Sequence, residues 1–321
     1  MRRMIVFRSL AMVVLLAAVT AANPGAQRPP YDGIVVFGTS LSDPGNAFAL
    51  LGVTNTPPDY LVDSLLVPSA PYARGGQHFS NGATWIEQFA RSRGLAGSVR
   101  PAFADLEINS TNYAVGAARA REDGVNLNLG TQLGRFLQQT GGVADPESLY
   151  VVEMGVNDIR DALVVFSGGG DGAPVLQAAN AAIAGAVQTL YAAGARKFLI
   201  WRVPDAGATP AVRTLDSLHP GTAQLATGLT LAFNGGLDGV VTQLSALPGI
   251  EIARLDAFAL INALVADPSA FGLTNVTTAC ITPSVAPFTC ANPDEYLFWD
   301  GIHPSKAVHA IVAQATAAAL Q

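Results

Sequence analysis

The sequence predicts an α/β protein with three layers, α/β/α, around a central and mainly five-stranded parallel sheet. Five short apolar runs recur along the chain, and stretches with a helical pattern separate them. The runs are nearly continuous in hydrophobicity rather than alternating, which is typical of parallel strands covered on both faces. Half of the 321 residues are apolar and only 13% are charged, so the chain can build a large buried core.

The order of these segments defines the predicted elements. The expected strands are residues 34–37, 112–115, 149–153, 198–203 and 250–255. The expected helices are residues 84–93, 131–139, 175–192, 222–244 and 305–320. Strands that alternate with helices favour a parallel sheet with right-handed crossovers. The carboxyl ends of the strands then meet at one edge of the sheet, where ligands bind in open α/β sheets.

The N-terminal stretch has the pattern of a secretory signal peptide. Arg2 and Arg3 precede a short apolar segment, and small residues follow it up to Ala22. This pattern predicts cleavage near Ala21 or Ala22 and export to a secreted or periplasmic location. We therefore expect a signal peptide (1–22), a flexible lead-in (23–30) and a single domain (31–321), without a stable membrane anchor.

Charge and cysteine content exclude some functions and favour an oxidising compartment. The net charge is −6 and Lys and Arg form no long run, which argues against a nucleic-acid partner. Cys280 and Cys290 are the only cysteines and lie close together in one loop-like stretch. In an exported protein such a pair predicts a disulfide, with a stabilisation of about 2–3 kcal/mol.

A serine stands where the first predicted strand ends. In "GIVVFGTSLSDPGN" (33–46) an apolar run breaks into turn residues at Ser40. Gly116 and Asn157 follow the second and third predicted strands, so all three residues are expected at the same edge of the sheet. Turn residues alone would also account for the break. The shared edge favours Ser40 as a nucleophile.

A nucleophilic serine needs a base and a group that orients the base. In "FWDGIHPS" (298–305) Asp300 precedes His303 by three residues. This spacing lets the carboxylate bind the imidazole Nδ1 and leaves Nε2 free to accept the serine proton. We expect His219 and His309 to be ordinary packing or surface residues.

The same reaction needs donors for a developing oxyanion. Gly116 lacks a side chain, so a substrate can approach its backbone N–H, and the Asn157 amide offers a side-chain N–H. Either residue taken alone also fits a plain structural role, as a turn glycine or a helix cap.

Four blocks of the sequence resemble the GDSL family of SGNH hydrolases. They are "FGTSLSDPGN", "NYAVGAA", "GVNDI" and "WDGIHPS", in the order of the family and spread over residues 34–305. The resemblance implies a flavodoxin-like α/β/α SGNH hydrolase fold and ester hydrolysis through an acyl-enzyme. It makes Ser40 the nucleophile, His303 the base and Asp300 its orienting group. It assigns the oxyanion hole to Ser40, Gly116 and Asn157.

One position departs from the family, because Thr39 stands where its members usually carry Asp before the serine. The substrate is expected to be a small-molecule or lipid ester. Alternatives on the same fold are a lipid acyltransferase, a carbohydrate deacetylase or a non-catalytic secreted binding module. The sequence contains neither H-E-x-x-H nor the glycine-rich motifs of nucleotide sites, so we expect neither a metal nor a cofactor.

Overall fold

The computed structural model describes residues 30–104 and 110–321, and a sheet of four parallel strands lies at its centre. The strands follow the order β1-β2-β3-β4. They are β1 (Gly33–Gly38), β2 (Ser148–Glu153), β3 (Lys197–Arg202) and β4 (Glu251–Asp256). The predicted signal peptide and all but the last residue of the predicted lead-in lie outside the described residues.

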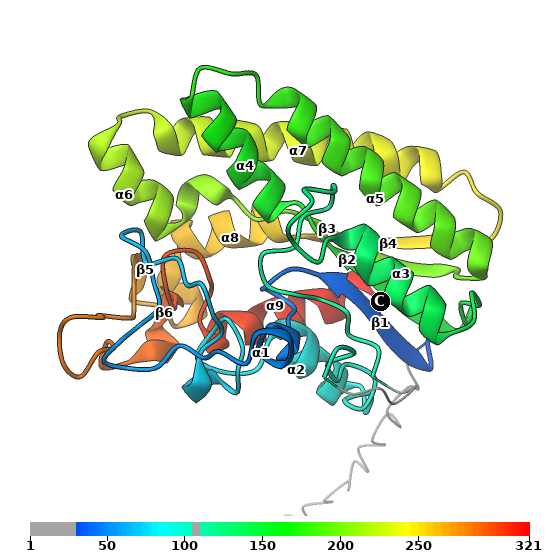
Figure 1. Ribbon diagram of the computed structural model, residues 1–321, viewed down its shortest axis with the longest axis horizontal. Coiled ribbons are helices and arrows are strands. Elements are labelled where there is room, and N and C mark those ends of the chain that lie inside the picture. Colours follow the sequence, from blue (N-terminus) through cyan, green and yellow to red (C-terminus); the bar gives the residue numbers. More distant parts are fainter. Residues whose placement is uncertain (1–29, 105–109) are drawn as a thin grey trace, which may run out of the picture.

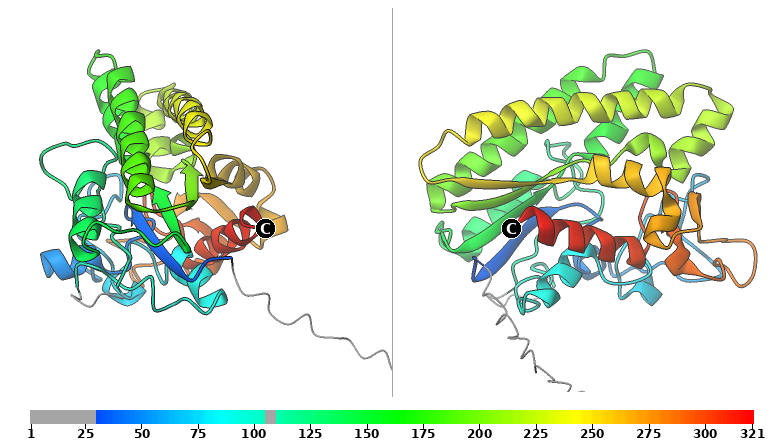
Figure 2. Two further views of the ribbon diagram at one scale, coloured as in Figure 1. Left: turned by 90° about the vertical axis from the view of Figure 1, so that its right-hand side faces the viewer. Right: turned by 180° about the vertical axis from the view of Figure 1, so that it is seen from behind.

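Helices cover both faces of this sheet and make three layers (Figure 1, Figure 2). Val35 and Phe37 of β1 pack into one layer, and Ile34 and Val36 pack into the other, because successive side chains of a strand point to opposite faces. The first layer contains α3 (Leu129–Gln139), α4 (Val156–Ser167), α5 (Ala173–Ala193) and α7 (Thr222–Leu244). The second contains α2 (Trp85–Ser92), α8 (Ala257–Ala266) and α9 (Lys306–Ala319). The predicted three-layer α/β/α fold is confirmed.

The five predicted helices correspond to α2, α3, α5, α7 and α9, with bounds that differ by two residues at most. The prediction did not include α1 (Asn46–Leu51), α4, α6 (Pro210–Leu218) or α8. The sequence of α8, "AFALINALVA", is almost entirely apolar, so it shows little of the periodicity that marks an amphipathic helix. Short 3-10 turns complete the helical part at Ala73–Gly75, Ala206–Ala208, Pro268–Phe271 and Pro293–Glu295.

The fifth predicted strand, residues 112–115, is an extended segment rather than a strand. It runs beside β1, where Tyr113 N–H donates to Val36 O at 2.8 Å and Val115 N–H donates to Gly38 O at 3.2 Å. Its other side is bonded partly by backbone, where Ala102 N–H donates to Asn112 O, and partly by Asn46 Nδ2, which donates to the carbonyls of residues 112 and 114. The sheet therefore has four strands instead of five, and the segment closes the edge beyond β1.

A second, smaller sheet lies away from the main one. It pairs β5 (Asn275–Ala279) with β6 (Tyr296–Phe298), just before the Asp300–His303 segment. The predicted disulfide between Cys280 and Cys290 is present and closes the loop between these two strands. Among the helices in the described ranges, none is long and apolar enough to cross a bilayer.

Candidate active site

Ser40 lies in a tight turn at the carboxyl end of β1. Ser42 N–H donates to Thr39 O at 3.1 Å and closes this turn. The segment Thr39–Ser42, called here the nucleophile turn, is buried, and Ser40 itself is 8% exposed. Gln132 of α3 donates to Gly38 O and accepts from Gly38 N–H, so the end of β1 is held from the neighbouring helix. The sheet thus fixes where the Ser40 hydroxyl points.

The structure brings Ser40, His303 and Asp300 together. His303 Nε2 lies 2.8 Å from Ser40 Oγ, and His303 Nδ1 lies 2.8 Å from Asp300 Oδ2. These residues are up to 263 positions apart in sequence, and all are buried. The arrangement is that of a nucleophile hydrogen-bonded to a base, which is oriented in turn by a carboxylate.

The Asp300 carboxylate accepts hydrogen bonds at both oxygens. Oδ1 accepts from Ile302 N–H at 2.9 Å and from His303 N–H at 2.7 Å, so the short turn holds its own carboxylate. Oδ2 accepts from the Tyr72 hydroxyl at 2.9 Å as well as from His303. Burial, together with the Asp300 carboxylate, raises the pKa of Tyr72 far above its usual value, so this hydroxyl stays a donor. Sequence reasoning did not identify Tyr72.

Two further groups shape the surroundings of His303. The Phe79 ring packs on the imidazole with centroids 5.3 Å apart, and it also fills the space where a Gly116 side chain would be. Gly301 N–H donates to Leu66 O at 2.9 Å, and a Cβ on Gly301 would meet Leu65 O at 2.0 Å. The loop around Leu66 therefore packs directly on the turn that carries the base.

The remaining histidines do not belong to this arrangement. His309 is buried, and its Nδ1 accepts from Trp85 N–H at 3.1 Å. Burial and, to a smaller extent, the nearby His78 and His303 lower the pKa of His309 to about 3. It is neutral and structural, as predicted. His78 Nε2 lies 2.8 Å from Glu87 at the start of α2. His219 is exposed at the end of α6, on the rim of the cavity described below.

The two predicted oxyanion donors outside the nucleophile turn are placed differently. Asn157, in the first turn of α4, lines the same cavity as Ser40 and His303, and its Nδ2 donates one hydrogen to Ala118 O at 2.8 Å. Gly116 N–H donates to Asp43 Oδ2 at 2.8 Å. Asp43 is fully buried, and burial raises the pKa of its carboxyl to about 6. Four backbone hydrogen bonds to the carboxylate oppose this rise.

A buried carboxyl that the sequence did not predict supports the nucleophile turn. Glu153, the last residue of β2, accepts from Thr39 N–H at 2.9 Å, Thr39 Oγ1 at 3.0 Å and Ser42 Oγ at 3.0 Å. A glutamate at the end of a buried apolar strand was the available signal, since parallel pairing places it beside Gly38. Burial raises the pKa of Glu153 to about 7, and the hydrogen bonds from Thr39 and Ser42 oppose that rise.

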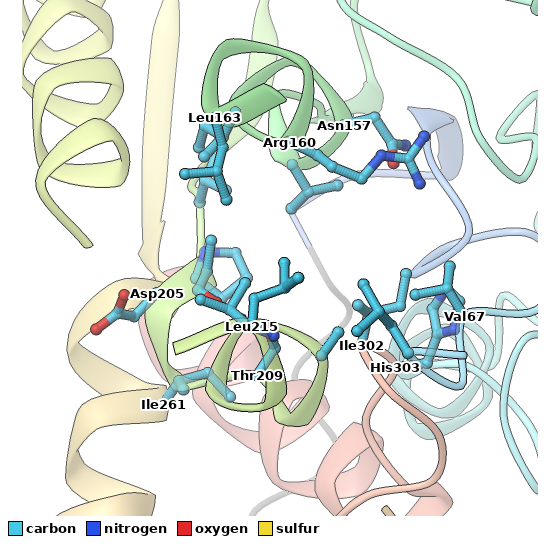
Figure 3. Close-up of a pocket in the computed structure, with 18 of the residues that line it drawn as sticks. Val67, Asn157, Arg160, Leu163, Asp205, Thr209, Leu215, Ile261, Ile302 and His303 are labelled. Atoms are coloured by element: carbon cyan, nitrogen blue, oxygen red, sulfur yellow. Dashed lines mark hydrogen bonds between the residues drawn. The ribbon is translucent and has the colours of Figure 1, made fainter. Parts of the chain in front are cut away.

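A deep cavity of about 1170 Å³ opens beside Ser40 and His303. Figure 3 shows Asn157, Arg160 and Leu163 on α4 at one side of this space, with Ile302 and His303 across from them. Most of the lining is aliphatic or aromatic and comes from α4, α6, α8 and α9, including Leu163, Phe166, Val212, Leu215, Ile261 and Val312. Such a cavity accommodates a long apolar group adjacent to the serine hydroxyl.

The family model and the similar proteins all point to one family. The family model described as GDSL-like Lipase/Acylhydrolase matches residues 34–316. A GDSL esterase/lipase of Arabidopsis thaliana is 28% identical, and the alignment covers 96% of both chains. A second GDSL esterase/lipase of the same plant is 27% identical over 87% of this chain and 85% of its own.

Proposed function

The chain belongs to the family of GDSL-like lipases and acylhydrolases and is a carboxylic ester hydrolase, and we propose that Ser40, His303 and Asp300 are its catalytic triad. The 2.8 Å contact between Ser40 Oγ and His303 Nε2 carries this proposal. Asp300 accepts from Nδ1–H, which fixes the tautomer whose Nε2 accepts a proton.

The reaction proceeds in two acyl transfers. Ser40 Oγ attacks the ester carbonyl carbon while its proton moves to His303 Nε2, and a tetrahedral oxyanion forms. The intermediate collapses, His303 returns the proton to the leaving alkoxide, and the alcohol departs from the acyl-enzyme. Water then attacks the acyl carbon, again giving a proton to His303, and the acid is released as Ser40 Oγ regains that proton.

The oxyanion requires donors that are not already used within the protein. In the described part of the chain, no group accepts from Ser40 N–H. Asn157 Nδ2 carries two hydrogens, and one remains after its bond to Ala118 O. Gly116 stays in the proposal as a third donor. Because its N–H is bonded to Asp43, it can serve a substrate only by sharing that hydrogen or after the bond breaks.

The cavity favours esters with a long apolar group over sugar acetates. Its lining beyond the serine is mainly aliphatic, and its volume far exceeds the needs of an acetyl group. Each CH₂ moved from water into such a site contributes about 0.8 kcal/mol. Where this gain is realised in the transition state, kcat/KM rises by up to about fourfold per CH₂.

The test is turnover of p-nitrophenyl esters from acetate to palmitate by the wild type and by Ser40→Ala. We expect turnover to vanish in the variant and the wild-type kcat/KM to rise with chain length. Ser269→Ala, an exposed serine outside the lining of the cavity, is the matched control and should keep wild-type activity. Wild-type-like turnover by Ser40→Ala would end the proposal.

A second variant separates the substrate class from the mechanism. Leu215→Trp narrows the cavity without touching Ser40, so it should lower kcat/KM for palmitate far more than for acetate. Equal losses on both esters would contradict the placement of the acyl chain in this cavity.

We also propose that residues 31–321 form a single SGNH hydrolase domain and that the protein is exported after removal of residues 1–22. The disulfide and the family match over residues 34–316 support these proposals. N-terminal sequencing of the protein from a periplasmic or culture fraction tests the cleavage, and an intact Met1 in that fraction would contradict it.

A further inference from the structure

We propose that Glu153 is a positioning residue for the nucleophile, and that its carboxylate holds the nucleophile turn from β2. This inference rests on the proposed role of Ser40. In this chain the position before the serine is Thr39, whose side chain cannot carry a charge. The carboxylate is supplied instead from the neighbouring strand.

The register of the sheet brings Glu153 to this position. Gly38 and Glu153 are partners in the parallel pairing of β1 and β2, and each is the last residue of its strand. A Cβ on Gly38 would lie 2.9 Å from Glu153 Oε2. The missing side chain at Gly38 therefore leaves the space that the carboxylate occupies, directly before the nucleophile turn.

The donors around Glu153 all point toward it. Thr39 gives its backbone N–H and its hydroxyl, and Ser42 gives its hydroxyl. Ser42 Oγ in turn accepts from Trp85 Nε1–H at 2.9 Å, and an indole nitrogen can only donate. The Ser42 proton is thereby directed to Glu153. The site is built for an ionised carboxylate, because a protonated one would require a hydroxyl to turn round.

No charged side chain acts on Glu153 in the parts of the chain that the structure describes. The groups that bond it are Thr39 and Ser42, while Trp85 of α2 bonds Ser42 and Gln132 of α3 bonds Gly38. Burial without a cation raises the pKa of this carboxyl to about 7, so its charge changes near neutral pH. Deprotonation of Glu153 then completes the support of the nucleophile turn.

Glu153 is absent from the lining of the cavity, so it acts on Ser40 through the turn and not on the substrate. Its carboxylate accepts from Thr39 N–H, while Ser40 N–H has no acceptor among the described residues and Ser40 Oγ lies 2.8 Å from His303 Nε2. Loosening this turn misplaces the attacking oxygen. A misplacement by about 1 Å can cost roughly 10²-fold in rate.

The first test is Glu153→Gln, measured as kcat, KM and pH profile on a p-nitrophenyl ester. We expect kcat to fall roughly 10- to 100-fold, with KM within about twofold because no substrate contact is lost. On the acid side the wild-type log kcat should fall more steeply than that of the variant, since Glu153 must be deprotonated in the wild type and Gln cannot titrate. The variant should lack this additional fall. Glu147→Gln, an exposed glutamate just before β2, is the matched control and should behave as the wild type.

The second test is the double variant Thr39→Asp with Glu153→Gln, which returns a carboxylate to the turn from the other side. We expect it to regain at least about tenfold of the lost kcat, with thermal unfolding checked for each protein. A wild-type kcat and acid-side fall in Glu153→Gln would overturn the inference, and so would a folded double variant without recovery. Ser40→Ala in the same assay keeps the two proposals apart. If it retains activity the triad fails, whereas if it is inactive and Glu153→Gln is normal only this inference fails.

Discussion

The two halves of the proposed triad are held by different kinds of structure. Ser40 follows β1, and the side chains of β1 alternate between the two hydrophobic cores that cover the sheet. The turn that carries Ser40 is bonded to β2 through Glu153. Apart from the hydrogen bond to His303, Ser40 is positioned by its own strand and by groups of β2 and of α3, a helix packed on the sheet. We call this part the sheet side.

His303 and Asp300 lie on a part with little regular structure, which we call the loop side. It comprises the long segment around Tyr72 and Leu66, the two-stranded β5–β6 sheet and the disulfide loop. Tyr72, Trp299 and the disulfide cysteines belong to one small apolar cluster, separate from the cores of the main sheet. The base is thus held by a few long-range contacts rather than by an extensive core.

The difference teaches that a nucleophile and its base can have unequal support. Regions with few buried apolar contacts open locally at a lower free energy than core strands. We therefore expect the loss of a hydrogen bond on the sheet side to lower the reaction rate while the fold stays intact. The loss of a bond on the loop side should first increase the mobility of His303.

The largest expected effect outside the triad and the nucleophile turn is that of Asn157→Ala, on the sheet side. If its free amide hydrogen binds the oxyanion, kcat should fall by roughly 10²–10³. Asn180→Ala is the matched control, because Asn180 is equally buried and its Nδ2 also donates to a backbone carbonyl, Phe233 O. It should lower stability and leave kcat unchanged. An unchanged kcat in Asn157→Ala would reduce this residue to its bond with Ala118.

The next effect is on the loop side, where Cys280→Ser with Cys290→Ser removes the disulfide. Opening a ring of this size costs about 2–3 kcal/mol of stability. If the loop side is a separate local unit, esterase activity should be lost at a lower temperature than far-UV ellipticity in this variant. In the wild type both should be lost together. If the variant also lost activity and ellipticity at the same temperature, the two sides would unfold together. The loop side would then not be a separate local unit.

The sheet side is also the part that the sequence predicted best. Continuous apolar runs, a serine at the end of the first run and an asparagine after a later one identify the edge of a parallel sheet. The Asp300–His303 pair was predictable for another reason, since both residues lie in one short turn. The disulfide, between cysteines ten positions apart, was local in the same sense.

What the sequence did not reveal are contacts that only the folded chain brings together. Tyr72 is 228 residues from Asp300 and lies in a segment without periodic pattern. The sequence around Glu153 indicates only the end of an apolar strand, because its neighbour Gly38 follows from the register of the sheet. The expected fifth strand is an extended segment with single bridges, because Asn46 and the backbone of residues 100–102 bond its outer side, and no amphipathic pattern encodes that.

The smallest of these effects, and the most direct test of the loop side, is Tyr72→Phe. The substitution keeps the buried ring against Trp299 and removes only the hydrogen bond to Asp300 Oδ2. Hydrogen bonds to charged groups contribute about 1.5–3 kcal/mol. His303 and two backbone N–H groups still hold Asp300, so we expect part of this, a fall in kcat of about tenfold or ~1.4 kcal/mol, with little change in KM.

The matched control is Tyr60→Phe, whose ring packs edge-on against Tyr72 at 6.0 Å and whose hydroxyl is not bonded to Asp300. It should keep kcat within about twofold, since it removes a hydroxyl from the same cluster without touching the carboxylate. A normal kcat in Tyr72→Phe would mean that the Asp300 turn orients His303 unaided. The orientation of the His303 imidazole would then depend only on the turn from Asp300 to His303. The long-range contacts of the loop side would contribute to stability alone.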